Sequence, residues 1–574
     1  MNSNLKLASV KIYCKIFLLI SPGILQAQVS ESWSARYNGP GSSTDNARAI
    51  AVDYTGNVFV TGSSPSAGLG TEDYATIKYD SAGVVQWTAR YNGTGTSTDN
   101  AYAIAVDEEG FIYVTGASTG SGSGLDFMTI KYSTDGDTVW TRRYNGPRNA
   151  KDVAYSICID DSGNIYVGGE SEGSTGTHGI FEDYATIKYN SDGVLRWIAR
   201  YNGPAGDYDK ANSVDVDDLG NVFVTGVSDG GSSGSGEPHF DYATIKYNNT
   251  GVVQWIRRYN NTANALDEGK SVKVDILRNV VVTGSSKNLS SSDDYFTIKY
   301  TSTGDTIWMS TYNGTGNNTD IANQLAVDDL GNTYVTGKSF GGSSTDYDIV
   351  TIKYNSTGDS VWVKRFNGEA SGIDEAVAIV VDTDANCYIT GYSSGTTTSF
   401  DYTTIKYNSI GAEEWVIKYT NSGAAGSSDQ AAGIFVDSLL NVYVTGMSAL
   451  DYATVKYKQT TTSVGSTPIN MPDEFILYQN YPNPFNPTTK IKFTIPNRTE
   501  YYSVPQIVTL KVYDVLGNEV ATLVDEYLPA GSYEKEFTAE ELSSGVYFYQ
   551  LTIMVPEINS GQGTIQTKRM ILIK

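Results

Sequence analysis

Two histidines, His178 and His239, are the residues with the clearest capacity for chemistry, and each lies near carboxylates in a Gly/Ser-rich stretch. The set comprises His178, Glu182, Asp183, Glu237, His239 and Asp241. Imidazole beside carboxylates suits a metal site or general acid–base catalysis. Nothing in the sequence fixes the separation of the two histidines, and a pair of exposed loop histidines is the alternative interpretation. We treat the six residues as candidate ligand-binding residues, with no catalytic residue and no metal assigned.

Two series of aspartates recur along the chain. The first comprises Asp45, Asp99, Asp152, Asp209, Asp267, Asp320, Asp374 and Asp429, and the second comprises Asp73, Asp126, Asp183, Asp241, Asp294, Asp348, Asp401 and Asp451. Rings of carboxylates attract cations such as Ca²⁺, which prefers several oxygen ligands. Aspartates also cap turns, and a residue present in every repeat usually serves the repeat. We expect structural roles, and Ca²⁺ is the one cofactor that the sequence leaves open.

Lysine, arginine and tryptophan recur in the same way. The series are Lys78, Lys131, Lys188, Lys246, Lys299, Lys353, Lys406 and Lys456, then Arg36, Arg90, Arg143, Arg200, Arg258 and Arg365, and all eight tryptophans. Cross-strand pairing with carboxylates is expected for the cations. The tryptophans are expected to pack between repeats, although sugar stacking is an alternative use of such rings.

The elements that carry these residues form a repeat. The motif Trp-x-x-Arg-Tyr-Asn-Gly returns about every 55 residues from Trp33 to Trp415, and three short strands lie between successive copies. In the first unit these strands are Ala49–Asp53, Asn57–Gly62 and Asp73–Tyr79. Four strands per unit predict an all-β, eight-bladed β-propeller over residues 28–458. The strand that begins at Ala49 is expected to be innermost and the Trp strand outermost.

The two ends of the repeat are complementary. The last unit lacks a Trp strand, whereas Trp33–Tyr37 stands alone before the first unit. We expect Trp33–Tyr37 to complete the eighth blade and close the ring, because closure removes free sheet edges. The alternative is eight units divided at the Trp strand with no exchange.

The loops divide into two kinds. Links such as Asp53–Asn57 are tight turns, whereas Ser63–Glu72, Glu170–Glu182 and Val227–Phe240 are long and rich in glycine and serine. Long loops on a rigid scaffold usually carry binding, so the face with the long loops is the expected functional surface.

Composition and the N-terminus indicate an exported protein. Residues 1–27 have a basic start, a short apolar stretch and a small residue at Ala27, which is typical of a signal peptide. No later segment is apolar for long enough to span a membrane. Cys158 and Cys387 fall in different units and are expected to remain unpaired. The net charge of −24 argues against a nucleic-acid partner.

The repeat, with its AIAVDYTGNVFVTG and DYATIKY segments, resembles the bacterial seven-bladed beta-propeller repeat family over residues 33–457, here with eight units. After a linker at 459–472, residues 473–574 resemble the C-terminal sorting domain of the type IX secretion system. The matching motifs are LYQNYPNPFNP, VYDVLGNEV, LPAGSY, LSSGVYFYQL and the terminal KRMILIK. This resemblance implies a small immunoglobulin-like β-sandwich that the outer-membrane translocon recognises. A carbohydrate-binding sandwich is the alternative.

Three functions are compatible with this organisation. The first is a secreted or cell-surface binding or adhesion protein with a glycan or protein ligand, exported through the periplasm by the type IX route. The second is an extracellular hydrolase or lyase that acts on polysaccharide or peptide with loop carboxylates. The third is a structural surface protein without a ligand. Catalysis would require positioned, non-repeating acids or bases, and the histidine set is the candidate for them.

Overall fold

The computed structural model describes residues 28–460 and 475–574, apart from residues 42, 68–70, 96, 176–179, 232–238, 262–264, 289–291, 422–425, 496–505, 529–530, 541 and 555–563. The described residues form β-strands and turns without a helix. No helix in them is therefore able to cross a membrane. The expected signal peptide, residues 1–27, lies outside the described residues.

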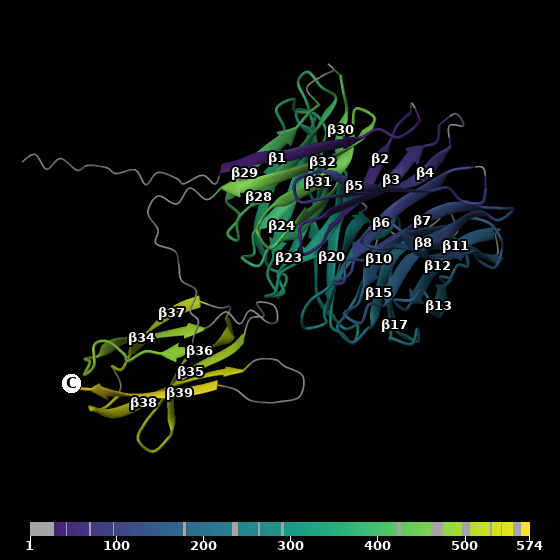
Figure 1. The fold of residues 1–574 in the computed structure, drawn as a ribbon. Helices are drawn as coiled ribbons and strands as arrows, with labels where there is room; N and C mark the ends of the chain where they lie inside the picture. Colours follow the sequence, from purple (N-terminus) through teal and green to yellow (C-terminus); the bar gives the residue numbers. More distant parts are fainter. Residues whose placement is uncertain are drawn as a thin grey trace, which may run out of the picture.

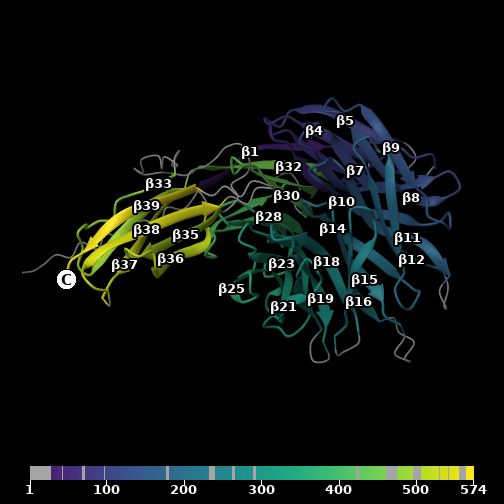
Figure 2. The ribbon, with the colours of Figure 1, turned by 90° about the horizontal axis from the view of Figure 1, so that it is seen from below.

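The repeats fold into eight four-stranded antiparallel sheets, which we call blades (Figures 1 and 2). The first strands are β2 (Asn46–Val52), β6 (Asp99–Val106), β10 (Asp152–Ile159), β14 (Asp209–Val216), β18 (Asp267–Val274), β22 (Asp320–Val327), β26 (Asp374–Val381) and β30 (Asp429–Val436). The second strands are β3 (Val58–Pro65), β7 (Ile112–Gly120), β11 (Ile165–Thr175), β15 (Val222–Asp229), β19 (Val280–Lys287), β23 (Thr333–Gly342), β27 (Cys387–Ser394) and β31 (Val442–Ser448).

The third strands are β4 (Glu72–Tyr79), β8 (Gly124–Tyr132), β12 (Ile180–Tyr189), β16 (Phe240–Tyr247), β20 (Asp293–Tyr300), β24 (Asp346–Tyr354), β28 (Phe400–Tyr407) and β32 (Asp451–Thr460). The fourth strands are β5 (Val85–Tyr91), β9 (Thr138–Tyr144), β13 (Leu195–Tyr201), β17 (Val253–Tyr259), β21 (Thr306–Tyr312), β25 (Ser360–Phe366), β29 (Glu413–Tyr419) and, for the eighth blade, β1 (Gln28–Tyr37). First strands of neighbouring blades contact one another, β30 and β2 included, which confirms that they are innermost.

The N-terminal strand belongs to the last blade. β1 pairs antiparallel with β32, with Trp33 opposite Lys456 and Tyr37 opposite Tyr452, and Figure 1 shows the two strands side by side. The expected exchange of Trp33–Tyr37 is confirmed, and the alternative without exchange is wrong. β32 runs to Thr460, so the start of the expected linker continues the sheet.

The eighth and first blades are joined by the contacts that join other neighbours. Trp33 Nε1 donates to the Ser81 carbonyl at 3.1 Å, as Trp87 Nε1 donates to that of Thr134 at 3.0 Å. Tyr452 Oη donates to the Ala75 carbonyl at 3.3 Å. Gly83 lies under the Trp33 ring at a positive φ, and an added Cβ would come within 2.5 Å of that ring. The glycine of this turn is therefore required by a close approach between blades.

Apolar side chains fill the spaces between blades. Val60 and Ile77 of the first blade pack with Tyr443 and Tyr452 of the eighth in one cluster. Each fully buried side chain of this size contributes about 1.5–3 kcal/mol relative to exposure. The core is thus divided into equivalent layers, each shared by two blades.

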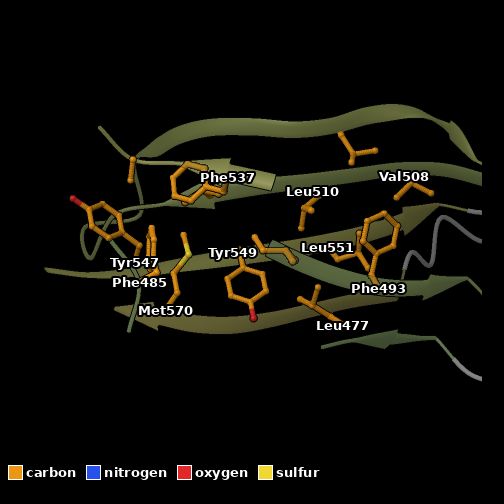
Figure 3. Packing of buried hydrophobic residues seen from close by; sticks show 14 of the residues in the cluster. Leu477, Phe485, Phe493, Val508, Leu510, Phe537, Tyr547, Tyr549, Leu551 and Met570 are labelled. Carbon is orange, nitrogen blue, oxygen red and sulfur yellow. The ribbon is translucent and has the colours of Figure 1, made fainter. Parts of the chain in front are cut away.

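Residues 475–574 form two further sheets. One contains β33 (Ile476–Leu477), β34 (Thr488–Ile495) and β37 (Gly531–Thr538) in that order, and the other contains β36 (Glu519–Leu528), β35 (Gln506–Tyr513), β38 (Gly545–Met554) and β39 (Thr564–Leu572). Figure 3 shows Phe493 from the first sheet beside Leu510 and Leu551 from the second. One buried cluster therefore joins the two sheets.

Candidate functional site

The aspartates that open the inner strands are structural. All eight are buried, and Asp209 accepts a hydrogen bond from the Gly203 N–H at 2.6 Å. These carboxylates fix the connection that enters each blade. Burial raises the pKa of Asp209 to about 7 and the pKa values of Asp152 and Asp267 to about 6.

The aspartates of the third strands form ion pairs within their blades. Asp126 pairs with Arg143 at 2.7 Å, and the pair between Arg36 and Asp451 at 2.9 Å reproduces this contact between β1 and β32. The predicted pairing of the arginines with carboxylates is confirmed for these pairs. No group of three or more His, Cys, Asp or Glu residues in the described chain is placed to hold a metal ion.

The repeated lysines differ from the expectation. Lys78 Nζ donates to the Thr134 carbonyl of the next blade at 2.8 Å and lies 5.5 Å from the centre of the Phe59 ring. Lys299 alone of the repeated lysines pairs with a buried carboxylate, that of Asp275 at 2.8 Å, while Lys406 pairs with half-buried Glu414. Most of these lysines therefore tie one blade to the next through a carbonyl and an aromatic ring, because the carboxylates on their own strands are already held by arginines.

The structure describes four of the six candidate ligand-binding residues, namely Glu182, Asp183, His239 and Asp241. His178 and Glu237 lie outside the described residues. Asp183 pairs with Arg200 at 2.9 Å and Asp241 with Arg258 at 2.7 Å. His239 is buried and acts electrostatically on Asp241, but burial is the larger influence and raises the pKa of Asp241.

The expected loop Glu170–Glu182 is mostly strand. β11 continues to Thr175 and β12 begins at Ile180, with Glu172 opposite Glu182. Glycine and serine predicted a loop here, but pairing along the extended hairpin supplies the backbone hydrogen bonds that local composition does not indicate. Glu182 therefore lies on a strand, where Lys151 contacts it at 3.3 Å.

A different set of residues emerges from a bulge that every inner strand contains. The strand register shifts at the same place in each blade, as between Ala47 and Ala49. Bulges redirect side chains. The residue at the shift differs from blade to blade, and we call the set the inner ring: Arg48, Tyr102, Tyr155, Asn212, Lys270, Asn323, Val377 and Ala432. All eight are half-buried.

Three residues of the inner ring, Arg48, Tyr102 and Tyr155, form a row with Lys210 of β14 in which cations flank aromatic rings. The Arg48 guanidinium lies 4.9 Å from the centre of the Tyr102 ring, and the Tyr102 and Tyr155 ring centres are 5.5 Å apart. Lys210 Nζ lies 4.4 Å from the centre of the Tyr155 ring. We call these four residues the aromatic arc; they come from the inner strands of four successive blades.

A buried carboxylate supports the arc. Glu170, whose side chain is 1% exposed, pairs with Lys151 at 2.6 Å and accepts hydrogen bonds from Tyr155 Oη at 2.8 Å and Tyr208 Oη at 3.1 Å. Burial, with the negative charge of Glu170, raises the pKa values of both tyrosines. The two phenols are thus held protonated as donors.

A second carboxylate organises the opposite side of the inner ring. Glu375 receives Lys338 Nζ at 2.8 Å, Tyr392 Oη at 2.8 Å and Asn323 Nδ2 at 2.9 Å. Burial acts to raise the pKa of Glu375, but these donors outweigh it and hold the pKa below its ordinary value. Lys270 Nζ, at 3.3 Å from Asn323 Oδ1, extends the network.

The inner ring was not among the predicted site residues, although the sequence carries a signal for it. Within each inner-strand segment the flanking residues recur, while the position of the inner ring changes from arginine to tyrosine, asparagine or lysine. A variable polar position inside a constant strand marks a site that the repeat itself does not need.

A pocket of about 930 Å³ lies on the face that carries the tight turns, between the turns of the second and third blades. Its lining includes Asp107 and Asp160. Both have turn-forming roles: Asp160 Oδ1 accepts the Asn164 N–H at 2.8 Å, and Asp107 Oδ1 accepts the Phe111 N–H at 2.8 Å. These acidic side chains therefore serve the turns.

Comparison with known proteins agrees with the fold. A model of the beta-propeller repeat matches residues 32–70, 86–122, 139–174, 196–232 and 418–449, and a model of the secretion system C-terminal sorting domain matches residues 479–571. An uncharacterized WD repeat-containing protein of Acanthamoeba polyphaga mimivirus is 24% identical over 453 residues. That alignment covers 56% of this chain and 31% of the relative, so the chain spans about a third of the length of that protein.

Solved structures show a distant likeness. The extracellular domain of a putative hybrid two-component system from B. thetaiotaomicron is 12% identical, with a TM-score of 0.31 and coverage of 93% of this chain and 73% of that chain. A polysaccharide lyase, Uly1, is 11% identical, with a TM-score of 0.37 and coverage of 74% and 91%. The sorting domain implies interaction with the secretion system and export to the cell surface or secretion. The chain thus contains beta-propeller repeats and, over residues 479–571, a type IX secretion system C-terminal sorting domain.

Proposed function

We propose that this secreted surface protein is a binding or adhesion protein that holds a glycan or protein ligand at its inner ring. In this proposal residues 1–27 are a signal peptide, residues 28–458 a closed eight-bladed propeller, residues 459–472 a linker and residues 473–574 an immunoglobulin-like sorting domain. The pairing of β1 with β32 supports closure, and the buried core between two sheets supports the sandwich.

One observation carries the proposal. The residues that recur in every unit are used in holding the blades, as the pairs Arg143–Asp126 and Lys78–Thr134 illustrate. The polar residues that break the repeat meet at the inner ring. Non-repeating polar and aromatic groups gathered on a rigid scaffold are characteristic of recognition sites.

Binding is favoured over hydrolysis or lyase chemistry by the state of the carboxylates. Glu170 and Glu375 are each held by three donors, and Asp183 and Asp241 are held by arginines. A general acid or base must exchange a proton with the substrate. Carboxylates that are already held by ion pairs and hydrogen bonds are poorly placed for such an exchange. The expected histidine set lacks two of its members among the described residues, so it stays a prediction.

The test is a glycan array combined with a turnover screen on polysaccharides and peptides, using the purified full-length protein. Binding without turnover is expected, with loss of binding in Tyr155→Ala and not in Lys364→Gln, an outer-strand variant of β25. Turnover that disappears in His239→Ala would instead establish the enzymatic alternative. Absence of both would favour a structural surface protein.

A further inference from the structure

We propose that the aromatic arc binds an acidic polysaccharide through the carboxylates of its uronate units, an inference that rests on the proposed binding function. The arc has a cation at each end and two tyrosine rings between them, so it presents the two chemical features that such a polymer offers in return: negative charges and sugar ring faces.

The sign of the charge is the first argument. Among the described residues, neither the Arg48 nor the Lys210 side chain makes a hydrogen bond or an ion pair, and their contacts with Tyr102 and Tyr155 are those of cations with aromatic rings. Arg48 Nε is buried without a hydrogen-bond partner. Guanidinium and ammonium groups without carboxylate partners favour an anionic ligand, and this contrasts with a chain whose net charge is −24.

The acids that neighbour the arc have donors other than Arg48 and Lys210. Glu170 and Glu182 both contact Lys151, which lies 2.6 Å and 3.3 Å from their oxygens. Glu268 accepts a hydrogen bond from Asn212 at 3.0 Å. The acids near the arc are therefore held by Lys151, by the Tyr155 hydroxyl and by Asn212, and none of them forms an ion pair with Arg48 or Lys210 among the described residues.

The rings and their arrangement are the second argument. Tyr102 and Tyr155 are half-buried, with ring centres 5.5 Å apart and planes inclined by 53°. Tyrosine offers a flat apolar surface together with a polar edge, which suits the C–H faces and hydroxyls of sugars. Since the arc crosses the inner strands of four blades, a linear polymer can contact several of its groups at once, which multiplies weak contacts.

Charge density favours a uronate polymer over a nucleic acid. Nucleic-acid binding relies on many cations that neutralise closely spaced phosphates. The arc supplies two, and the rest of the chain carries an excess of acids. A uronate polymer carries its carboxylates on sugar rings, so it can present a few negative charges together with the ring faces that the two tyrosines suit.

The test is a titration of the purified full-length protein with polygalacturonate and with the same polymer after methyl esterification. Esterification removes the charge and retains the sugar backbone, so we expect about tenfold weaker binding, corresponding to about 1.4 kcal/mol. Arg48→Gln and Lys210→Gln should each weaken polygalacturonate binding about tenfold, whereas Lys364→Gln, with the same charge change on β25, should have less than about a twofold effect.

Several results would overturn the inference. They are equal binding of the esterified and free polymers, equal loss in Lys364→Gln, tighter binding of single-stranded DNA or polyglutamate than of polygalacturonate, and no binding of polygalacturonate or alginate. A neutral glycan whose binding is lost in Tyr155→Ala would also end it, while leaving the proposed binding function intact. Melting temperatures of the variants within about 3 °C of wild type establish that the changes act on binding rather than folding.

Discussion

At the scale of the residue, this protein uses most of its charges for structure. Asp209 accepts a hydrogen bond from the Gly203 N–H where the chain enters its blade, and Asp183 forms an ion pair with Arg200. These two repeated aspartates are thus buried and already have structural partners. The residues without a repeated task are those of the inner ring. A charged residue is therefore informative here when it breaks the pattern.

Burial of the inner-strand aspartates predicts greater stability at mildly acidic pH. Asp209 has a pKa of about 7 in the folded state, above the value near 4 of an unfolded chain, so the folded state binds more protons between about pH 4 and 7. The free energy of unfolding should therefore fall as pH rises from 5 to 8. Urea midpoints at the two pH values measure this difference.

The matched variants are Asp209→Asn and Asp218→Asn. The first retains an acceptor for the Gly203 N–H and removes a titrating group, so the difference between pH 5 and 8 should shrink. The second removes a carboxyl whose pKa Arg278 lowers and which is ionised in both states over this range, so the difference should persist. An Asp209→Asn protein with an unchanged pH dependence would contradict the prediction.

Because the two cysteines of the described chain form no disulfide, reducing agents should not change the stability of the folded protein. Cys158 and Cys387 are both unpaired, as expected from their places in different blades, and burial raises the pKa of each thiol. Cys387 is fully buried. A thiol reagent at pH 8 should modify Cys387 only upon unfolding, and dithiothreitol should leave the melting temperature unchanged; rapid modification in the folded protein would refute this.

At the scale of the element, β1 acts as a latch between the ends of the repeat. It provides the outer strand of the eighth blade, and its Trp33 makes the contact with the first blade that Trp87 makes with the second. Strand exchange between chain ends adds non-local pairing and leaves no blade with only three strands.

Equivalent tryptophans test the latch. Trp33→Ala and Trp87→Ala each remove a half-buried ring and one hydrogen bond, and each should lower the free energy of unfolding by about 2–4 kcal/mol in urea denaturation. The two losses should agree within about 1 kcal/mol if β1 is as firmly held as an internal strand. A negligible loss for Trp33→Ala alone would show that β1 contributes little to closure.

At the scale of the whole molecule, a repeat scaffold, for which we propose a binding role, is joined to a sorting domain. The propeller repeats end at β32, and the two-sheet domain from residue 475 contains the region that matches the sorting domain. The two parts have separate buried clusters. Each therefore has its own core, and export is expected to depend on one and recognition on the other.

Removal of residues 473–574 tests this division in a bacterium that has a type IX secretion system. The truncated protein should accumulate in the periplasm, because the segment that the translocon recognises is absent, and cell fractionation with immunoblotting measures its location. A periplasmic marker and the inner-ring variant Tyr155→Ala, which should still be exported, are the controls. Surface exposure of the truncated protein would contradict the assignment.

Much of the architecture could be predicted from the sequence. The strand that begins near Ala49 is innermost, the Trp strand is outermost, and Trp33–Tyr37 pairs beside the last repeat. These features follow from the alternation of apolar and polar residues along each strand and from the number of repeated units. Both signals recur in each repeat, so they are easily recognised. The prediction that the lysines pair with carboxylates is wrong for most of them, because their carbonyl acceptors lie on the next blade, which local sequence does not identify.

The sequence by itself determined the number of blades, their strand order, the exchange of the first strand and the attachment of a sorting domain, since each is written in a repeated or terminal motif. Only the tertiary structure decided which side chains meet. Arg48, Tyr102, Tyr155 and Lys210 are separated by about one repeat each in the chain and become neighbours because the inner strands of successive blades converge. The bulge that redirects the residues of the inner ring is likewise a product of pairing between strands, not of local composition.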